Sequence, residues 1–208
     1  LENQPGLILK THGSTFSILD RESCLSKIND VKNMFPREWN LPNVYLLHGE
    51  FTNEEMNQLY NHPKVKAFVS LTHGEGFGRP LLEASMVGLP VIASGWSGQM
   101  DFLDGEKSML IPGNLDKVPK SAHWKDIIVP ESQWFTASEN NVYQAFKHSV
   151  ENIDSVKHRA IELMEINRKK FTLKNMSSEL DKMMDKYVAD MPQQVGIKLP
   201  KLKKVGGN

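Results

Sequence analysis

Short apolar runs alternate with amphipathic segments along the first half of the chain. Residues 65–71 and 89–94 are rich in aliphatic and β-branched side chains, which is typical of buried parallel strands. The expected elements are, in chain order, a strand at 7–10, a helix near 22–33, a strand at 44–48, a helix at 53–61, a strand at 65–71, a helix at 80–88, and strands at 90–94 and 108–111. This alternation predicts an α/β fold, a Rossmann-like parallel sheet with helices on both faces.

The second half of the chain is expected to end in a helical extension. Helices are predicted from Ser138 to about Glu151, near 154–169 and near 173–188. In the last of these, apolar residues recur at helical spacing, which is more typical of a core face than of an interface, although truncation of the chain would leave some of them exposed. They are Met176, Leu180, Met183, Met184 and Tyr187.

Between the two halves, residues 112–137 combine prolines with tryptophans and the apolar run Ile127-Ile128-Val129. We expect an irregular but ordered excursion, because this segment is too apolar to stay solvated. The predicted organisation is one domain over residues 1–190, followed by a basic tail over residues 191–208.

Composition is that of an ordinary globular domain. The chain has 208 residues, 39% of them hydrophobic and 24% charged, and its 25 Lys and Arg balance its 25 Asp and Glu. No overall field therefore favours nucleic acid or a membrane surface. Cys24 is the single cysteine, which excludes an internal disulfide and favours a reducing location. The expected location is the cytoplasm, and a peripheral position at a membrane is compatible with it. No apolar run reaches the roughly 18 residues of a transmembrane segment.

A glycine-rich run follows the expected strand 65–71. It is Thr72-His73-Gly74-Glu75-Gly76-Phe77-Gly78-Arg79-Pro80-Leu81-Leu82-Glu83. Pro80 suits the first position of the helix that follows, where its missing N–H costs nothing. A strand, a glycine turn and a helix N-terminus in this order favour a phosphate or another anion.

Two carboxylates flank this loop. Glu75 can accept hydrogen bonds from sugar hydroxyls, and Glu83, in the first turn of the helix, can accept from two adjacent ribose hydroxyls. The alternatives are that Glu83 only complements the helix dipole and that Glu75 is a solvated loop residue. The spacing alone leaves both interpretations open. A second small-residue loop, residues 95–101, follows the next strand, and such loops lie side by side at the carboxyl edge of a parallel sheet.

These residues resemble the donor-binding half of retaining GT-B glycosyltransferases of the family 4 type. The resemblance rests on Glu75-Gly76-Phe77-Gly78, on Glu83-Ala84, on Gly88-Leu89-Pro90-Val91-Ile92-Ala93-Ser94, and on Ser97-Gly98 with Asp101. It implies that Glu75 contacts the transferred sugar and has the catalytic role. It also implies that Glu83 binds the ribose, that the amide near Leu82 faces the diphosphate, and that the base packs against the loop containing Gly49 and Phe51. For Phe51, simple core packing is an equal alternative. The implied donor-binding residues are Gly49, Phe51, Gly76, Phe77, Gly78, Leu82, Glu83, Ser97 and Gly98.

The chain departs from the family pattern in two places. The family has two glycines followed by a Glu where this chain has Ser97-Gly98 and Asp101, and Trp96 beside them is more typical of a packing wall than of a sugar platform. The family's Arg and Lys that clamp the diphosphate have no counterpart. Lys10 and His12 are weak substitutes, because Lys10 has the character of an exposed strand end. The expectation is a fragment that lacks the first strand and helix of its domain and the acceptor-binding domain.

The resemblance implies transfer of a hexose, with retention, from a nucleoside-diphosphate sugar to an unknown acceptor. It implies a UDP- or GDP-linked donor, no cofactor and no metal, and an N-terminal domain as partner, so that the isolated chain is inactive. Two alternatives stay open: a non-enzymatic sugar-nucleotide-binding or interaction module, and a nucleotide-sugar epimerase of the same architecture.

Overall fold

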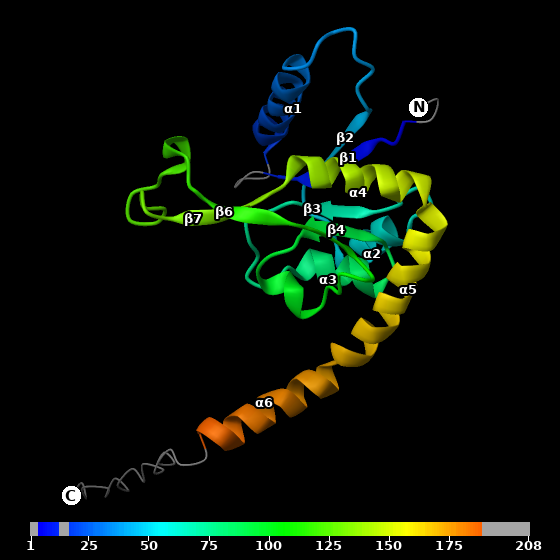
Figure 1. Ribbon diagram of the computed structural model, residues 1–208, viewed down its shortest axis with the longest axis vertical. Helices are drawn as coiled ribbons and strands as arrows, with labels where there is room; N and C mark the ends of the chain where they lie inside the picture. Colours follow the sequence, from blue (N-terminus) through cyan, green and yellow to red (C-terminus); the bar gives the residue numbers. More distant parts are fainter. Residues whose placement is uncertain (1–3, 13–16, 189–208) are drawn as a thin grey trace, which may run out of the picture. The chain divides into compact units, whose positions relative to one another are not determined.

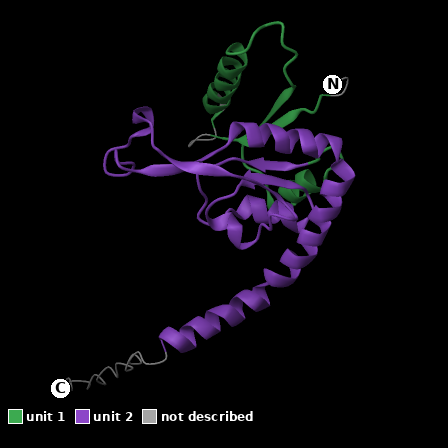
Figure 2. Ribbon diagram, viewed as in Figure 1, with its two compact units in different colours: residues 1–66 green, residues 67–208 purple. Residues whose placement is uncertain are grey.

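The computed structural model describes residues 4–12 and 17–188 (Figure 1). The chain divides into two compact units, residues 1–66 and residues 67–208 (Figure 2). The single domain expected over residues 1–190 stays a prediction. The basic tail expected over residues 191–208 lies outside the described residues.

The first unit contains two parallel strands and two helices. Strand β1 (Leu7–Thr11) pairs with β2 (Val44–His48), with Thr11 opposite His48. Helix α1 (Ile18–Asn33) connects them, and α2 (Asn53–Asn61) follows β2. The predicted strand at 44–48 and helix at 53–61 are confirmed.

Both helices of this unit begin at a side-chain cap. The Ser17 hydroxyl accepts a hydrogen bond from the Asp20 amide at 3.2 Å, so α1 starts before the predicted position near residue 22. At α2, the Thr52 hydroxyl accepts from the Glu55 amide while the Glu55 carboxylate accepts from the Thr52 amide. This reciprocal capping box fixes where α2 begins.

The second unit is built on a three-stranded parallel sheet. Its strands are β3 (Phe68–Ser70), β4 (Val91–Ser94) and β5 (Met109–Ile111), in the order β3-β4-β5. Every residue of the central strand β4 is buried. In Figure 1, helices α3 (Arg79–Met86) and α4 (Glu139–Glu151) lie on either side of this sheet. The predicted α/β class with parallel strands is confirmed, although β3 is shorter than the predicted strand at 65–71.

Helix α3 packs against α5 (Ile153–Lys170) to form the core of the second unit. Leu81 and Ala84 of α3 are buried with Leu163 of α5. One buried polar residue joins these helices: the side-chain amide of Asn167 donates to the Ser85 hydroxyl at 2.9 Å and to the Phe102 carbonyl at 3.1 Å. A buried carbonyl without a partner is costly, so this amide fixes α5 relative to α3.

We expect Asn167→Ala to lower the free energy of unfolding by about 1–3 kcal/mol, because it leaves the Phe102 carbonyl buried without this donor. Chemical denaturation of both proteins measures the change. Asn140→Ala, at an exposed position near the start of α4, is the matched control and should differ little from the unchanged chain. Equal losses from the two variants would contradict this role for Asn167.

The segment 112–137 is more regular than predicted. Strands β6 (Gly113–Lys117) and β7 (Gln133–Ala137) form an antiparallel ribbon in which Asp116 lies opposite Trp134. A short 3₁₀ helix, η2 (Lys120–Ala122), lies between them. The expectation of an irregular excursion was therefore wrong at its two ends. Strand β6 is mostly polar and exposed, so its pairing comes from main-chain hydrogen bonds that leave no hydrophobic pattern.

The three C-terminal helices are confirmed as α4, α5 and α6 (Leu173–Tyr187). The apolar face of α6 does not lie in a core: Met176, Leu180 and Tyr187 are each more than half exposed, which is the alternative that the sequence left open for some of these residues. In Figure 1, α6 runs on from α5 away from the sheet. No helix among the described residues is long and apolar enough to cross a membrane.

Candidate functional site

Two loops meet at the carboxyl end of the sheet in the second unit. Residues 71–78 connect β3 to α3, and residues 95–97 connect β4 to the 3₁₀ helix η1 (Gly98–Asp101). The hydroxyl of Ser94, the last residue of β4, donates to the Thr72 carbonyl at 2.8 Å. The two loops are therefore adjacent, as the strand order required.

The main chain of Glu75 is held by the second loop. The Ser97 hydroxyl donates to the Glu75 carbonyl at 2.6 Å and accepts from the Glu75 amide at 3.2 Å. The Gly98 amide also donates to the Glu75 carbonyl, at 3.0 Å. Ser97 has a φ of 78°, a backbone conformation that residues other than glycine rarely adopt. Its hydrogen bonds to Glu75 hold it in this conformation. The loops thus position Glu75 through its backbone.

Gly98 allows this close approach. A Cβ atom at residue 98 would lie 2.2 Å from the Gly76 carbonyl oxygen and 2.8 Å from the Glu75 carbonyl oxygen. No side chain fits at such distances, so glycine is required here. The structure therefore brings together Glu75, Gly76, Ser97 and Gly98 from the predicted site.

Gly78 turns the first loop into α3. It has φ 84° and ψ 47° and occupies the N-cap position, so α3 begins at Arg79, and Pro80 is second rather than first. The Leu82 amide donates to the Gly78 carbonyl at 3.1 Å. In this structure that amide belongs to the helix ladder, and its predicted contact with a diphosphate stays a prediction.

Glu83 lies one residue further into the helix than expected. It is the fifth residue of α3, so its assignment to the first turn was wrong, because the helix starts at Arg79. Its carboxylate forms an i,i+4 ion pair with Arg79, 2.6 Å from Nε to Oε1, with side-chain exposures of 36% for Glu83 and 72% for Arg79. The carboxylate is accessible to a ligand, and a neighbouring guanidinium orients it.

The Phe77 side chain anchors the first loop to an aromatic cluster. Its ring centroid lies 5.2 Å from that of Phe102 and 6.1 Å from that of Phe171, at the end of α5. These tilted contacts are favourable aromatic geometries. The Phe77 ring thus ties the first loop to Phe102 and Phe171, and the predicted donor contact of its main chain stays a prediction.

The β6–β7 ribbon contributes residues that the sequence did not assign to the site. The His73 ring stacks on Trp134 with centroids 3.8 Å apart and planes within 4°. The Nδ1 atom of His73 lies 2.7 Å from the Phe135 carbonyl oxygen, which accepts a hydrogen bond from the tautomer that carries a hydrogen on Nδ1. Trp96 stacks on Phe135 at 5.8 Å, which agrees with the packing role expected for this tryptophan. Trp134 and Phe135, adjacent in β7, therefore contact the first and the second loop respectively. In the sequence, only the position of His73 directly before Gly74-Glu75 could have indicated that it belongs to the site.

Gln99 is a second residue that the sequence analysis missed. Its side chain is fully buried, and its Nε2 donates to the Ser94 carbonyl at 2.9 Å. Its Oε1 has no hydrogen-bond partner among the described residues. Gln99 thus ties η1 to the end of β4.

We expect Trp134→Leu to loosen the loop 71–78, because the His73 ring loses its stacking surface. Hydrogen exchange at the amides of residues 73–78 should accelerate several-fold. Trp124→Leu is the matched control in the same segment, since Trp124 is largely exposed. Unchanged exchange in Trp134→Leu would show that the ribbon does not order the loop.

The remaining predicted residues belong to the first unit. Gly49 follows β2 with φ 114°, and the Lys10 ammonium lies 5.4 Å from the centroid of the Phe51 ring. This cation–π contact accounts for part of the environment of Phe51 without a ligand. Lys10 is exposed in β1, as expected. The predicted contact of Gly49 and Phe51 with a base stays a prediction.

Two solved structures are similar in fold to most of this chain. A sucrose-phosphate synthase from Thermosynechococcus elongatus aligns with a TM-score of 0.59 and 17% identity over 88% of this chain and 38% of its own. The Anabaena protein HepE, solved in complex with UDP and glucose, aligns with a TM-score of 0.59 and 14% identity over 87% of this chain and 40% of its own. Identities this low establish the fold alone. This chain spans about two fifths of the length of either structure.

A family model matches the part of the sequence that forms the site. Residues 37–123 match the family model described as "Glycosyl transferases group 1". That segment, less than half of the chain, contains both loops, Glu75 and Glu83. A search of curated proteins gives no match. The fold is therefore that of a GT-B glycosyltransferase domain, and the segment that forms the site is similar to group 1 glycosyl transferases.

Proposed function

We propose that this chain is the donor-binding part of a retaining glycosyltransferase, which moves a hexose from a nucleoside diphosphate to an acceptor. The proposal rests on the hydrogen bonds by which Ser97 and Gly98 hold the main chain of Glu75 at the carboxyl end of the sheet. Ligands of open α/β sheets bind at this edge. The UDP and glucose present in the HepE structure support a nucleotide sugar as the ligand class.

Each group has a role that its position supports. Glu75, half-buried on a fixed backbone, accepts hydrogen bonds from the sugar. The N-terminus of α3, reached through Gly78, carries the positive end of the helix dipole and suits the diphosphate. Glu83, one turn along, accepts from the ribose hydroxyls. For Gly49 and Phe51 of the first unit, the proposed role is contact with the base of the donor.

The proposed reaction is departure of the diphosphate followed by attack of the acceptor on the same face of the sugar. In this scheme the protein stabilises the charge of the leaving group and positions the sugar, and it needs no protein nucleophile. The donor is proposed to be UDP- or GDP-linked, without a metal or cofactor. The single cysteine fits a reducing, cytoplasmic setting.

Calorimetry of the 208-residue chain with UDP, GDP, ADP and their hexose conjugates tests the proposal. We expect one nucleotide series to bind weakly and Glu83→Ala to remove that binding. Transfer to any acceptor should be absent, because this chain corresponds to only part of its structural relatives. Absence of binding by every compound would contradict a donor site in this chain, and transfer above a variant control would contradict its inactivity.

A further inference from the structure

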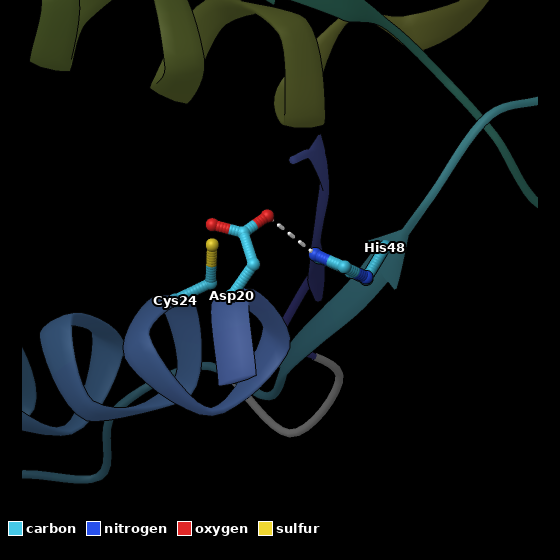
Figure 3. Close-up of side chains that lie close together, drawn as sticks. All are labelled: Asp20, Cys24 and His48. Atoms are coloured by element: carbon cyan, nitrogen blue, oxygen red, sulfur yellow. Dashed lines mark hydrogen bonds and ion pairs between the residues drawn. The ribbon is translucent and has the colours of Figure 1, made fainter. Parts of the chain in front are cut away.

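Three side chains of metal-ligating type converge in the first unit. Asp20 and Cys24 come from α1, and His48 is the last residue of β2 (Figure 3). One ligand atom from each lies within 4.8 Å of the others. The proposed transfer reaction gives these three residues no role.

The local structure explains how they meet. The Ser17 cap starts α1 so that Asp20 falls in its first turn, and Cys24 follows four residues later on the same face. Figure 3 shows the Cys24 sulfur beside the Asp20 carboxylate, with the His48 ring facing them from the strand. The His48 Nε2 atom lies 3.0 Å from Asp20 Oδ2, and these two side chains are 9% and 16% exposed.

We propose that Asp20, Cys24 and His48 bind one divalent transition-metal ion, for which Zn²⁺ is the best match. Zinc accepts carboxylate oxygen, thiolate sulfur and imidazole nitrogen at about 2.0–2.3 Å, which places tetrahedral ligand atoms about 3.5 Å apart. The three atoms here approach that spacing, and small side-chain rotations complete it. A water molecule fills the fourth position.

The donor set decides which metals fit. A thiolate disfavours Mg²⁺ and Ca²⁺, which prefer oxygen ligands, and favours Zn²⁺ and its close analogue Co²⁺. One carboxylate and one thiolate also balance the two positive charges of the ion. The complex is therefore neutral overall, which suits a partly buried position.

The consequence is a link between α1 and the β1–β2 sheet. Among the described side chains of α1, none is buried, so apolar packing holds this helix only weakly. A metal bound to two residues of α1 and one of β2 would fix the helix to the strand. The proposal does not depend on glycosyl transfer and gives the metal no part in it.

Zinc titration of the 208-residue chain, in competition with a chromophoric chelator, tests the proposal. We expect one Zn²⁺ per chain and a melting temperature that rises with Zn²⁺ but not with Mg²⁺. Cys24→Ser, His48→Gln and Asp20→Asn should each weaken binding by about tenfold or more. Asp30→Asn, exposed on the same helix, and His158→Gln, exposed on α5, are the matched controls and should bind as the unchanged chain does.

A second measurement needs no variant. Bound Zn²⁺ should slow alkylation of Cys24, the single cysteine, and Co²⁺ should produce a thiolate-to-metal charge-transfer band. Absence of zinc binding would overturn the proposal. Equal binding by Cys24→Ser would also overturn it, because the Asp20–His48 pair would then act without the thiol.

Discussion

Gly98→Ala is expected to destabilise the second unit and to remove donor binding. The added methyl group would overlap the Gly76 carbonyl oxygen at 2.2 Å, and that atom belongs to a main chain that cannot rotate away. Relief requires the two loops to separate, which breaks the hydrogen bonds from residues 97 and 98 to Glu75. Overpacking of this kind costs about 1–3 kcal/mol, or roughly 3–10 °C in melting temperature.

Differential scanning calorimetry and nucleotide titration of Gly98→Ala measure both effects. Gly105→Ala is the matched control, because a Cβ atom there meets only Leu110 Cδ1, at 3.7 Å. That variant should keep both the melting temperature and the affinity within small changes. A Gly98→Ala chain that melts and binds like the unchanged protein would contradict the close contact between the loops.

Glu83→Gln is expected to weaken nucleotide binding by about 10–100-fold. The substitution keeps the shape of the side chain but replaces an ionised acceptor, and a hydrogen bond to a charged group is worth about 1.5–3 kcal/mol. Stability should change little, since an exposed i,i+4 pair such as Glu83 with Arg79 contributes about 0.3–0.5 kcal/mol. Isothermal titration with the best-bound nucleotide measures the effect.

The control for this prediction is Arg79→Gln, which breaks the same ion pair but leaves the Glu83 carboxylate in place. Affinity should fall less in Arg79→Gln than in Glu83→Gln. Equal losses would mean that the pair acts as a unit, and the carboxylate would then have no separate contact with the ribose. No loss in either variant would place the ribose elsewhere.

The sequence predicted the elements whose signals are local. Strand β4 is a short apolar run with a glycine before it, and α2 has both halves of a capping box within four residues. Parallel strands followed by glycine loops then placed Glu75 beside Ser97 without further information, because such loops share one edge of a sheet. Local sequence patterns and the topology of parallel strands were therefore sufficient to predict these elements and the neighbouring loops.

Features that depend on distant partners were not predicted. The stacking of His73 on Trp134 joins residues 61 positions apart, through a ribbon whose polar strand shows no hydrophobic alternation. The apolar face of α6 follows the same spacing as a core helix, yet it is exposed. Periodicity identifies a helix and its apolar side but not what covers that side.

At Glu75, the position of the main chain and the chemistry of the side chain are set independently. The hydrogen bonds from Ser97 and Gly98 to Glu75 involve only its amide and carbonyl, which are backbone groups that every amino acid except proline offers at this position. The side chain at residue 75 can therefore change without loss of the hydrogen bonds that fix its main chain. Chemistry at this position can therefore diverge during evolution, or be redesigned, without rebuilding the scaffold that presents it.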